Sequence, residues 1–132
     1  QYLLDTDTCI QVLRGRANAV QRLAALTPGD CGISTISAYE LYQVWKSALT
    51  QLAKNRKLND ARDGHFDSIH PFTDDAAKQA AILRAELERL GTPIGPYDTL
   101  IAAQARQLNL TLVTSNTAEF SRVSGLKLED WR

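Results

Sequence analysis

Acidic side chains in this sequence recur at one kind of place, directly after a short apolar run or at the start of the helix that follows it. They are Asp5 and Asp7 after residues 2–4, Glu40 after residues 33–35, Asp98 in a first helical turn, and Glu119 after a run that ends at Thr114. If the apolar runs are parallel strands, all these places lie at one edge of a sheet, where ligands bind in such sheets. The spacing therefore predicts a cluster of carboxylates.

A cluster of this kind favours a hard divalent cation. Crowded carboxylates raise one another's pKa unless a cation sits among them. Oxygen ligands with no histidine or cysteine beside them select Mg²⁺ or Mn²⁺ over Zn²⁺. Such ions, about 4 Å apart, can activate water and neutralise charge on a phosphate. The pattern therefore predicts hydrolysis of phosphodiester bonds.

Taken alone, each acid also has a simpler explanation. Asp98 and Glu40 can be first-turn acids that the helix dipole stabilises by about 0.3–1 kcal/mol each. Asp5 or Asp7 can cap the first helix. Acids at the same end of successive strands are harder to explain as caps, and we interpret them jointly as a site.

The elements that must position these acids are clearest in residues 94–120. Gly95-Pro96 ends what precedes it, and a proline in the first turn of a helix loses no hydrogen bond. Apolar periodicity then predicts a helix as far as Leu108, with Asn109 as a left-handed C-cap. Residues 110–114 form a β-branched run typical of a buried parallel strand.

The rest of the chain also alternates strands and helices. We expect further strands at residues 2–4, 31–35, 66–72 and 126–128. Ser37 followed by Glu40 has the spacing of a capping box, and Thr73 caps a predicted helix over residues 74–90 that Gly91 ends. The alternation predicts a single α/β domain over residues 1–132, with a mainly parallel central sheet of four to five strands flanked by helices.

Composition narrows the function classes. Lys plus Arg and Asp plus Glu number 15 each, which disfavours a nucleic-acid binder that works by bulk charge, though not one that uses a local basic rim or metal ions. Cys9 and Cys31 stand in apolar runs and are interpreted as reduced, packed thiols of a cytoplasmic protein. His65 and His70 have no partner at metal spacing. No apolar run approaches the ~18 residues of a membrane span.

Several segments resemble the PIN-domain ribonucleases, and most closely their VapC branch, the toxins of bacterial toxin–antitoxin pairs. The resemblance rests, in order along the chain, on residues 2–7, 33–41, 95–103, 112–120 and 123–131. It implies an α/β/α sandwich that cleaves RNA with Mg²⁺ or Mn²⁺. Asp5, Glu40 and Asp98 match the family's three central acids. Asp5 and Asp98 would bind metal directly, and Glu40 directly or through water.

The fourth acidic place departs from the commonest family pattern. Many PIN domains have an aspartate where this chain has Asn116, and Glu119, one helical turn on, would restore the negative charge and complete the site. Thr114 and Asn116 would hydrogen-bond the acids or the substrate phosphate. Asp7 stands where relatives commonly carry asparagine, so it would add a carboxylate or only orient Asp5.

The resemblance also implies partners. These are an RNA substrate such as tRNA, a VapB-type antitoxin whose tail lies over the active site, and a second copy of the chain in a homodimer. Dimerisation would explain the surplus apolar surface around Tyr42 and Trp45. We expect the antitoxin tail in the groove between the first helices and the helix over residues 39–52.

Two alternative functions stay open at this point. Asp5-Thr6-Asp7 at the end of a strand also fits the opening of haloacid-dehalogenase-type phosphatases, in which Asp5 would be the nucleophile. Cys9 and the short chain fit that family poorly. The other alternative is a PIN-like domain that binds RNA without cleaving it, because Asn116 has weakened the site.

Overall fold

Five short parallel strands form the central sheet of the computed structural model, which describes residues 1–27, 29–52 and 68–132, the last eight residues of the second range by their backbone alone. The strands are β1 (Tyr2–Leu4), β2 (Cys31–Ser34), β3 (Ser68–His70), β4 (Thr111–Val113) and β5 (Leu128–Glu129). Their order is β3-β2-β1-β4-β5, and every neighbouring pair is parallel. The predicted α/β class and the mainly parallel sheet are confirmed.

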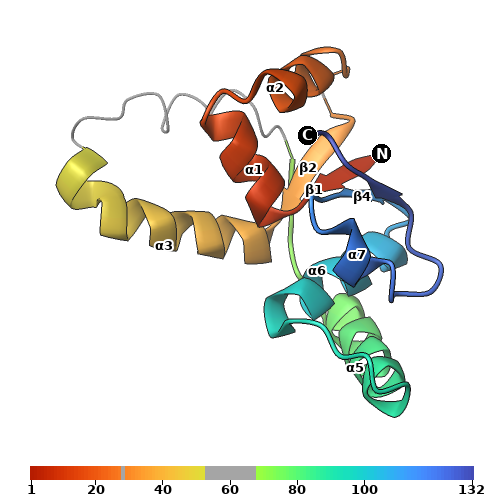
Figure 1. Ribbon diagram of the computed structural model, residues 1–132. Coiled ribbons are helices and arrows are strands. Elements are labelled where there is room, and N and C mark those ends of the chain that lie inside the picture. The colour runs from red at the N-terminus through yellow and green to blue at the C-terminus, as the bar shows by residue number, and fades with distance from the viewer. Residues whose placement is uncertain (28, 53–67) are drawn as a thin grey trace.

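Helices cover both faces of this sheet (Figure 1). They are α1 (Thr6–Leu13), α2 (Ala17–Ala24), α3 (Thr35–Leu52), α5 (Asp74–Arg89), α6 (Pro96–Gln107) and the short α7 (Thr117–Phe120). Successive side chains of a strand point to opposite faces. Leu3 and Leu112 accordingly pack with α5 and α6, whereas Leu4 and Val113 pack with α1, α2 and α3. The result is a three-layer α/β/α sandwich.

The register of the sheet places the ends of three strands side by side. Leu4 at the end of β1 pairs with Ile33 of β2 and with Val113 of β4. Because the strands are parallel, the residues that follow them emerge at one edge. This edge receives the starts of α1 and α3 and the loop before α7.

Several predicted helix ends are confirmed. The Thr73 hydroxyl accepts a hydrogen bond from the Ala76 N–H at 3.2 Å and caps α5. Gly91 beyond that helix has a φ of 69°, and Asn109 beyond α6 has a φ of 56°. Both angles lie in the left-handed region that ends helices.

The predicted cap at Ser37 is wrong. Helix α3 begins at Thr35, directly after β2, so no loop separates the two and Ser37 lies inside the helix. The side chain that meets a free N–H of the first turn is Ser34, whose Oγ accepts from the Ile36 N–H at 3.0 Å. The Ser37 hydroxyl is buried and, within the described residues, has no hydrogen-bond partner.

Most predicted strands have slightly different bounds in the structure. Strand β2 ends one residue before the predicted 35, and β4 is Thr111–Val113 rather than 110–114. Strand β3 ends at His70 rather than at the predicted residue 72, since Pro71 follows it and cannot donate to a ladder. The last strand is Leu128–Glu129 rather than 126–128. His65, residues 66 and 67 of the predicted strand, and the side chain of Trp45 lie outside the described part of the chain.

Cys9 and Cys31 are both buried and form no disulfide. This agrees with their interpretation as packed thiols. Among the helices of the described residues, none is long and apolar enough to cross a membrane.

Gly32 allows β2 and β3 to approach each other. A Cβ at this position would lie 2.8 Å from the Ser68 carbonyl oxygen and 2.8 Å from Nε2 of His70. The carbonyl cannot retreat without disturbing the β2–β3 ladder, so we expect Gly32→Ala to lower the free energy of unfolding by about 1–3 kcal/mol. Thermal denaturation measures this loss, and an unchanged melting temperature would show that the edge strand yields freely.

Candidate active site

Asp5 joins β1 to α1 at the carboxyl edge of the sheet. Its side chain is only 4% exposed, and it accepts a hydrogen bond from the Thr8 N–H at 2.8 Å as the N-cap of α1. The cap interpretation is therefore correct for this residue. It does not exclude a further role, because a carboxylate has about four lone-pair sites.

The surroundings of Asp5 act on its charge in opposite directions. Burial raises the pKa of the carboxyl group, while hydrogen bonds from the Thr114 side chain and from Thr8 lower it, and the charge of Asp7 raises it. The net effect is a pKa above the ordinary value. Thr114, one of the predicted supporting residues, thus contacts the acid directly.

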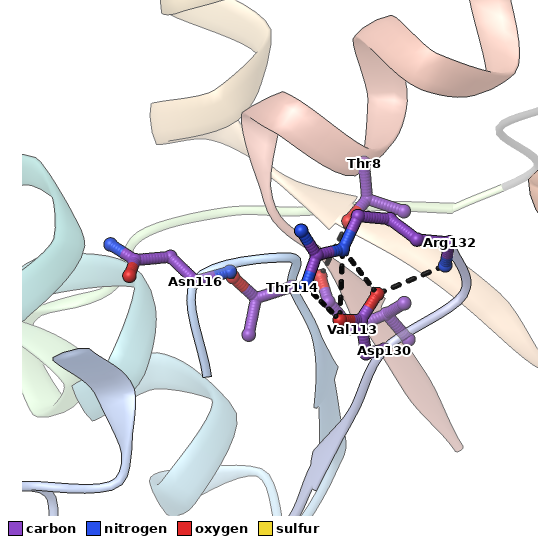
Figure 2. A network of polar contacts seen from close by, with 6 residues as sticks. All are labelled: Thr8, Val113, Thr114, Asn116, Asp130 and Arg132. Carbon is purple, nitrogen blue, oxygen red and sulfur yellow. Dashed lines mark hydrogen bonds and ion pairs between the residues drawn. The ribbon is translucent and has the colours of Figure 1, made fainter. Parts of the chain in front are cut away.

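Two threonine hydroxyl groups join the start of α1 to the end of β4 and the loop that follows it (Figure 2). The Thr8 hydroxyl donates to the Val113 carbonyl at 3.0 Å. That carbonyl also accepts from the Asp5 N–H at 3.0 Å. The Thr114 oxygen accepts from the Asn116 N–H at 3.0 Å, which directs the hydroxyl proton toward Asp5. The first turn of α1 and the end of β4 are therefore fixed relative to each other.

The C-terminal segment contributes an ion pair near this corner, between the Arg132 guanidinium and the Asp130 carboxylate (Figure 2). Their Nη2 and Oδ2 atoms are 2.7 Å apart. This interaction lowers the pKa of Asp130. A charge already paired in this way is a poor candidate for the site.

Glu40 is held by a residue that the sequence did not suggest. The Thr6 hydroxyl donates to Glu40 Oε1 at 2.6 Å, across 34 positions of sequence. Since α3 begins at Thr35, Glu40 lies in its second turn, and the interpretation as a first-turn acid favoured by the helix dipole is wrong. The sequence does not indicate this role for Thr6, because the contact with Glu40 exists only once β1 and β2 lie side by side.

Asp98 lies in the first turn of α6 and is the most perturbed acid of this edge. Burial, then the charges of Glu119, Asp5, Glu40 and Asp7 in decreasing order, raise its pKa to about 6. All the predicted acids therefore lie close enough to Asp98 to oppose its ionisation. The structure brings together the residues that the sequence placed at separate strand ends.

Glu119 is oriented by two neighbours. The Gly95 N–H donates to its Oε1 at 3.0 Å, and the Asn116 side-chain amide donates to its Oε2. A Cβ at Gly95 would lie 3.3 Å from Asp98 Oδ2, so a side chain there would crowd Asp98. The sequence indicates Gly95 as a helix stop and as part of the PIN-like segment 95–103, but nothing in it indicates that the Gly95 N–H binds Glu119.

These acids have the right chemistry for a hard divalent cation. Their donors are all carboxylate oxygens, the ligand type that Mg²⁺ and Mn²⁺ prefer. Within the described ranges, no three acidic, histidine or cysteine side chains already converge as a closed metal site. Like charges keep carboxylates apart. Burial and then the repulsion of the neighbouring acids raise the pKa of Asp98, and a cation would relieve that repulsion.

Comparison with known proteins finds similarity over nearly the whole chain. The family model described as PIN domain matches residues 2–126. A tRNA(fMet)-specific endonuclease VapC from Salmonella typhimurium is 38% identical, over 99% of this chain and 98% of that protein. The protein of the same name from Shigella flexneri is 36% identical over 99% and 98%.

Solved structures give the same answer for the fold. The crystal structure of VapBC2 from Rickettsia felis, bound to a DNA fragment from its promoter, superposes with a TM-score of 0.87 at 34% identity. The superposition covers 99% of this chain and 98% of the matched chain. The agreement includes the strand-end edge, because it spans all the elements that carry the acids.

Proposed function

Because the chain belongs to the PIN-domain family, in the branch of the VapC ribonucleases, we propose that it is a metal-dependent endoribonuclease and the toxin of a toxin–antitoxin pair. PIN-domain ribonucleases generally depend on divalent metal ions. The ion proposed for this chain is Mg²⁺ or Mn²⁺, and the proposed unit is one PIN domain over residues 1–132.

The gathering of the acids around Asp98 at one edge of the sheet carries this proposal. A half-buried carboxyl group whose ionisation is opposed by four other acids is an expensive arrangement for a folded protein. Caps and helix dipoles explain the places of Asp5 and Asp98 but not that of Glu40, which lies in the second turn of α3. Preparation for a cation and for an anionic phosphate explains the whole arrangement.

We assign direct metal ligation to Asp5 and Asp98. Glu40 would bind the ion directly or through water, and Glu119 would complete the site. When bound, such an ion supplies an acidic water and neutralises charge that develops on the phosphodiester.

The chain's other residues hold these acids in place. Thr6 fixes the Glu40 carboxylate, and the Gly95 N–H fixes that of Glu119. Thr114 donates to Asp5. Asp7 is exposed and adds negative charge near both Asp5 and Asp98. Such supporting hydrogen bonds typically change metal affinity or activity 10- to 100-fold, as an order of magnitude.

The proposed partners follow from the relatives. The substrate is RNA, with tRNA as the first candidate, and the neutralising partner is a VapB-type antitoxin. We further propose a homodimer and a cytoplasmic location. Tyr42, on the apolar surface predicted for dimerisation, is 41% exposed.

The alternatives receive less support. A haloacid-dehalogenase-type phosphatase is at odds with the PIN family match, and a nucleophile at Asp5 would be 4% exposed and engaged as a helix cap. An RNA-binding domain without cleavage needs a site weakened at Asn116. The amide of Asn116 instead contacts Glu119, which leaves a carboxylate at that place.

Cleavage of bulk tRNA tests the proposed function. We expect cutting with Mg²⁺ or Mn²⁺ and none with EDTA, and a loss of more than about 100-fold in Asp5→Asn, since an amide ligand lacks the charge. Asparagine still accepts the Thr8 N–H and keeps the cap, so the variant should melt as a folded protein.

Surface acid Asp75 provides the matched control. It lies exposed in the first turn of α5, and Asp75→Asn should cut as fast as the parent. RNA that binds but stays intact at every metal concentration would instead establish the non-cleaving alternative. Cleavage that persists in EDTA would refute the metal-dependent assignment.

A further inference from the structure

Two exposed tyrosines flank the carboxylate cluster. Tyr39 directly precedes Glu40 on α3, and Tyr97 directly precedes Asp98 at the start of α6. Each is 44% exposed. Their ring centroids lie 5.8 Å apart, with the ring planes tilted by 58°. Elements far apart in sequence therefore present one aromatic surface beside the acids.

A hydrogen bond and a ring contact hold this pair in position. The Gln43 side-chain amide donates to the Tyr39 hydroxyl at 2.8 Å. The contact between the two rings restricts the rotation of both side chains. Side chains fixed before binding lose little conformational entropy when a ligand arrives.

The carboxylates beside the two tyrosines repel the phosphate groups of RNA. Glu40 and Asp98 directly follow the two tyrosines, and the field of these carboxylates repels a phosphate that is not neutralised by a cation. An uncharged aromatic face gains affinity from a base without that penalty. Stacking of splayed bases on tyrosine is the usual way in which proteins hold single-stranded RNA, and it tolerates any base.

Space for a base exists next to Tyr97. The ring borders a groove of about 630 Å³ between α5 and the start of α6, lined also by Pro96, Leu100 and Phe72. The lining is largely apolar, which suits a flat base rather than a phosphate.

We propose that Tyr39 and Tyr97 form a stacking platform for an RNA base next to the phosphate that is cut. The inference rests on the proposed ribonuclease function and adds a determinant of how the substrate is held. The platform would select unpaired RNA, because a base in a duplex cannot leave its stack without cost.

Binding of two octamers of equal charge tests the platform. One is octauridine, and the other is an octamer of abasic ribose phosphate; both are titrated in EDTA at low salt, so that nothing is cut. We expect Tyr97→Ala and Tyr39→Ala to weaken octauridine binding by about 5- to 150-fold, with the abasic octamer unaffected. Tyr97→Phe keeps the ring and should bind within about 2-fold of the parent.

Leu108→Ala is the matched control, because Leu108 is 40% exposed at the far end of the same helix. It should change neither affinity. With metal and tRNA, the alanine variants should raise KM more than they lower kcat, whereas a general structural defect lowers both kcat and stability.

Several results would overturn the platform. Equal weakening of both octamers would indicate a backbone contact, and unchanged affinity would indicate no contact at all. If Tyr97→Phe were as weak as the alanine variant, the hydroxyl rather than the ring would be the binding group. Loss of self-association in sedimentation, with RNA affinity intact, would assign the pair to a contact between copies. A parent protein that neither binds nor cuts RNA would refute the proposed function itself.

Discussion

Asp98→Asn is expected to reduce RNA cleavage by more than about 100-fold and, at neutral pH, to raise the melting temperature of the metal-free protein. The first effect follows from the loss of a charged ligand, since even the groups that support metal ligands typically matter 10- to 100-fold. The second follows from the pKa of Asp98, which is about 6 in the folded protein against an ordinary 3.8.

The sign of the pH dependence is fixed by that shift. A carboxyl group with a raised pKa in the folded state binds its proton more tightly there than in the unfolded chain. The free energy of unfolding therefore falls as the pH rises from about 4 to about 6, and the deficit persists above that range. Asparagine carries no charge at any pH, so Asp98→Asn should lack this decline.

Thermal denaturation between pH 4 and pH 7.5, in EDTA, measures this difference. The parent and the variant should melt alike near pH 4 and diverge at higher pH, with the variant more stable. Added Mn²⁺ should raise the melting temperature of the parent, because an ion that binds the folded state stabilises it, and should act weakly on the variant. A variant that is less stable than the parent at pH 7 would contradict the electrostatic account of this edge.

Phe120→Ala is expected to remove about 3–5 kcal/mol from the free energy of unfolding. The Phe120 side chain is completely buried in the cluster formed by α5, α6 and the sheet. It also ends α7, directly after Glu119. Truncation therefore leaves a cavity under the loop that carries an acid, and cleavage should fall along with stability.

Urea denaturation measures the loss as a shift in midpoint at unchanged slope. Ile82→Ala is the control, since Ile82 is 50% exposed on α5 and its truncation should cost much less. A Phe120→Ala protein as stable as the control would mean that the surrounding residues collapse into the cavity. Cleavage that survives in the destabilised variant, below its melting temperature, would show that Glu119 does not depend on this packing.

Much of the fold could be predicted because local signals agree with the tertiary structure. Asn109 and Gly91 end helices where the left-handed region is needed, and the run before Thr114 forms a buried strand. Prediction failed where the local signal disagrees with the path of the chain in three dimensions. Ser37 has the right spacing for a cap, but β2 passes into α3 without a loop, and only the three-dimensional path shows that Ser34 takes the position.

The meeting of the acids at one edge of the sheet could be predicted, and the residues that hold them could not. Asp5 follows a strand and Asp98 begins a helix, and the apolar pattern predicts both elements. The parallel topology of the sheet then places both acids at one edge. Thr6 reaches Glu40 across 34 positions, and Gly95 reaches Glu119 across 24. Contacts of that range depend on side-chain geometry after folding, and neither hydropathy nor helix caps encode them.

The position of β1 in the middle of the sheet has a consequence for synthesis of the protein. β1 is made first, yet one of its two neighbours is β4, and Leu4 pairs with Val113. Such distant pairings form late, because a long loop must close before they contribute. A nascent chain therefore lacks a closed edge, as well as Glu119, until β4 and α7 have been made. The topology therefore makes the acid cluster one of the last features of the fold to assemble.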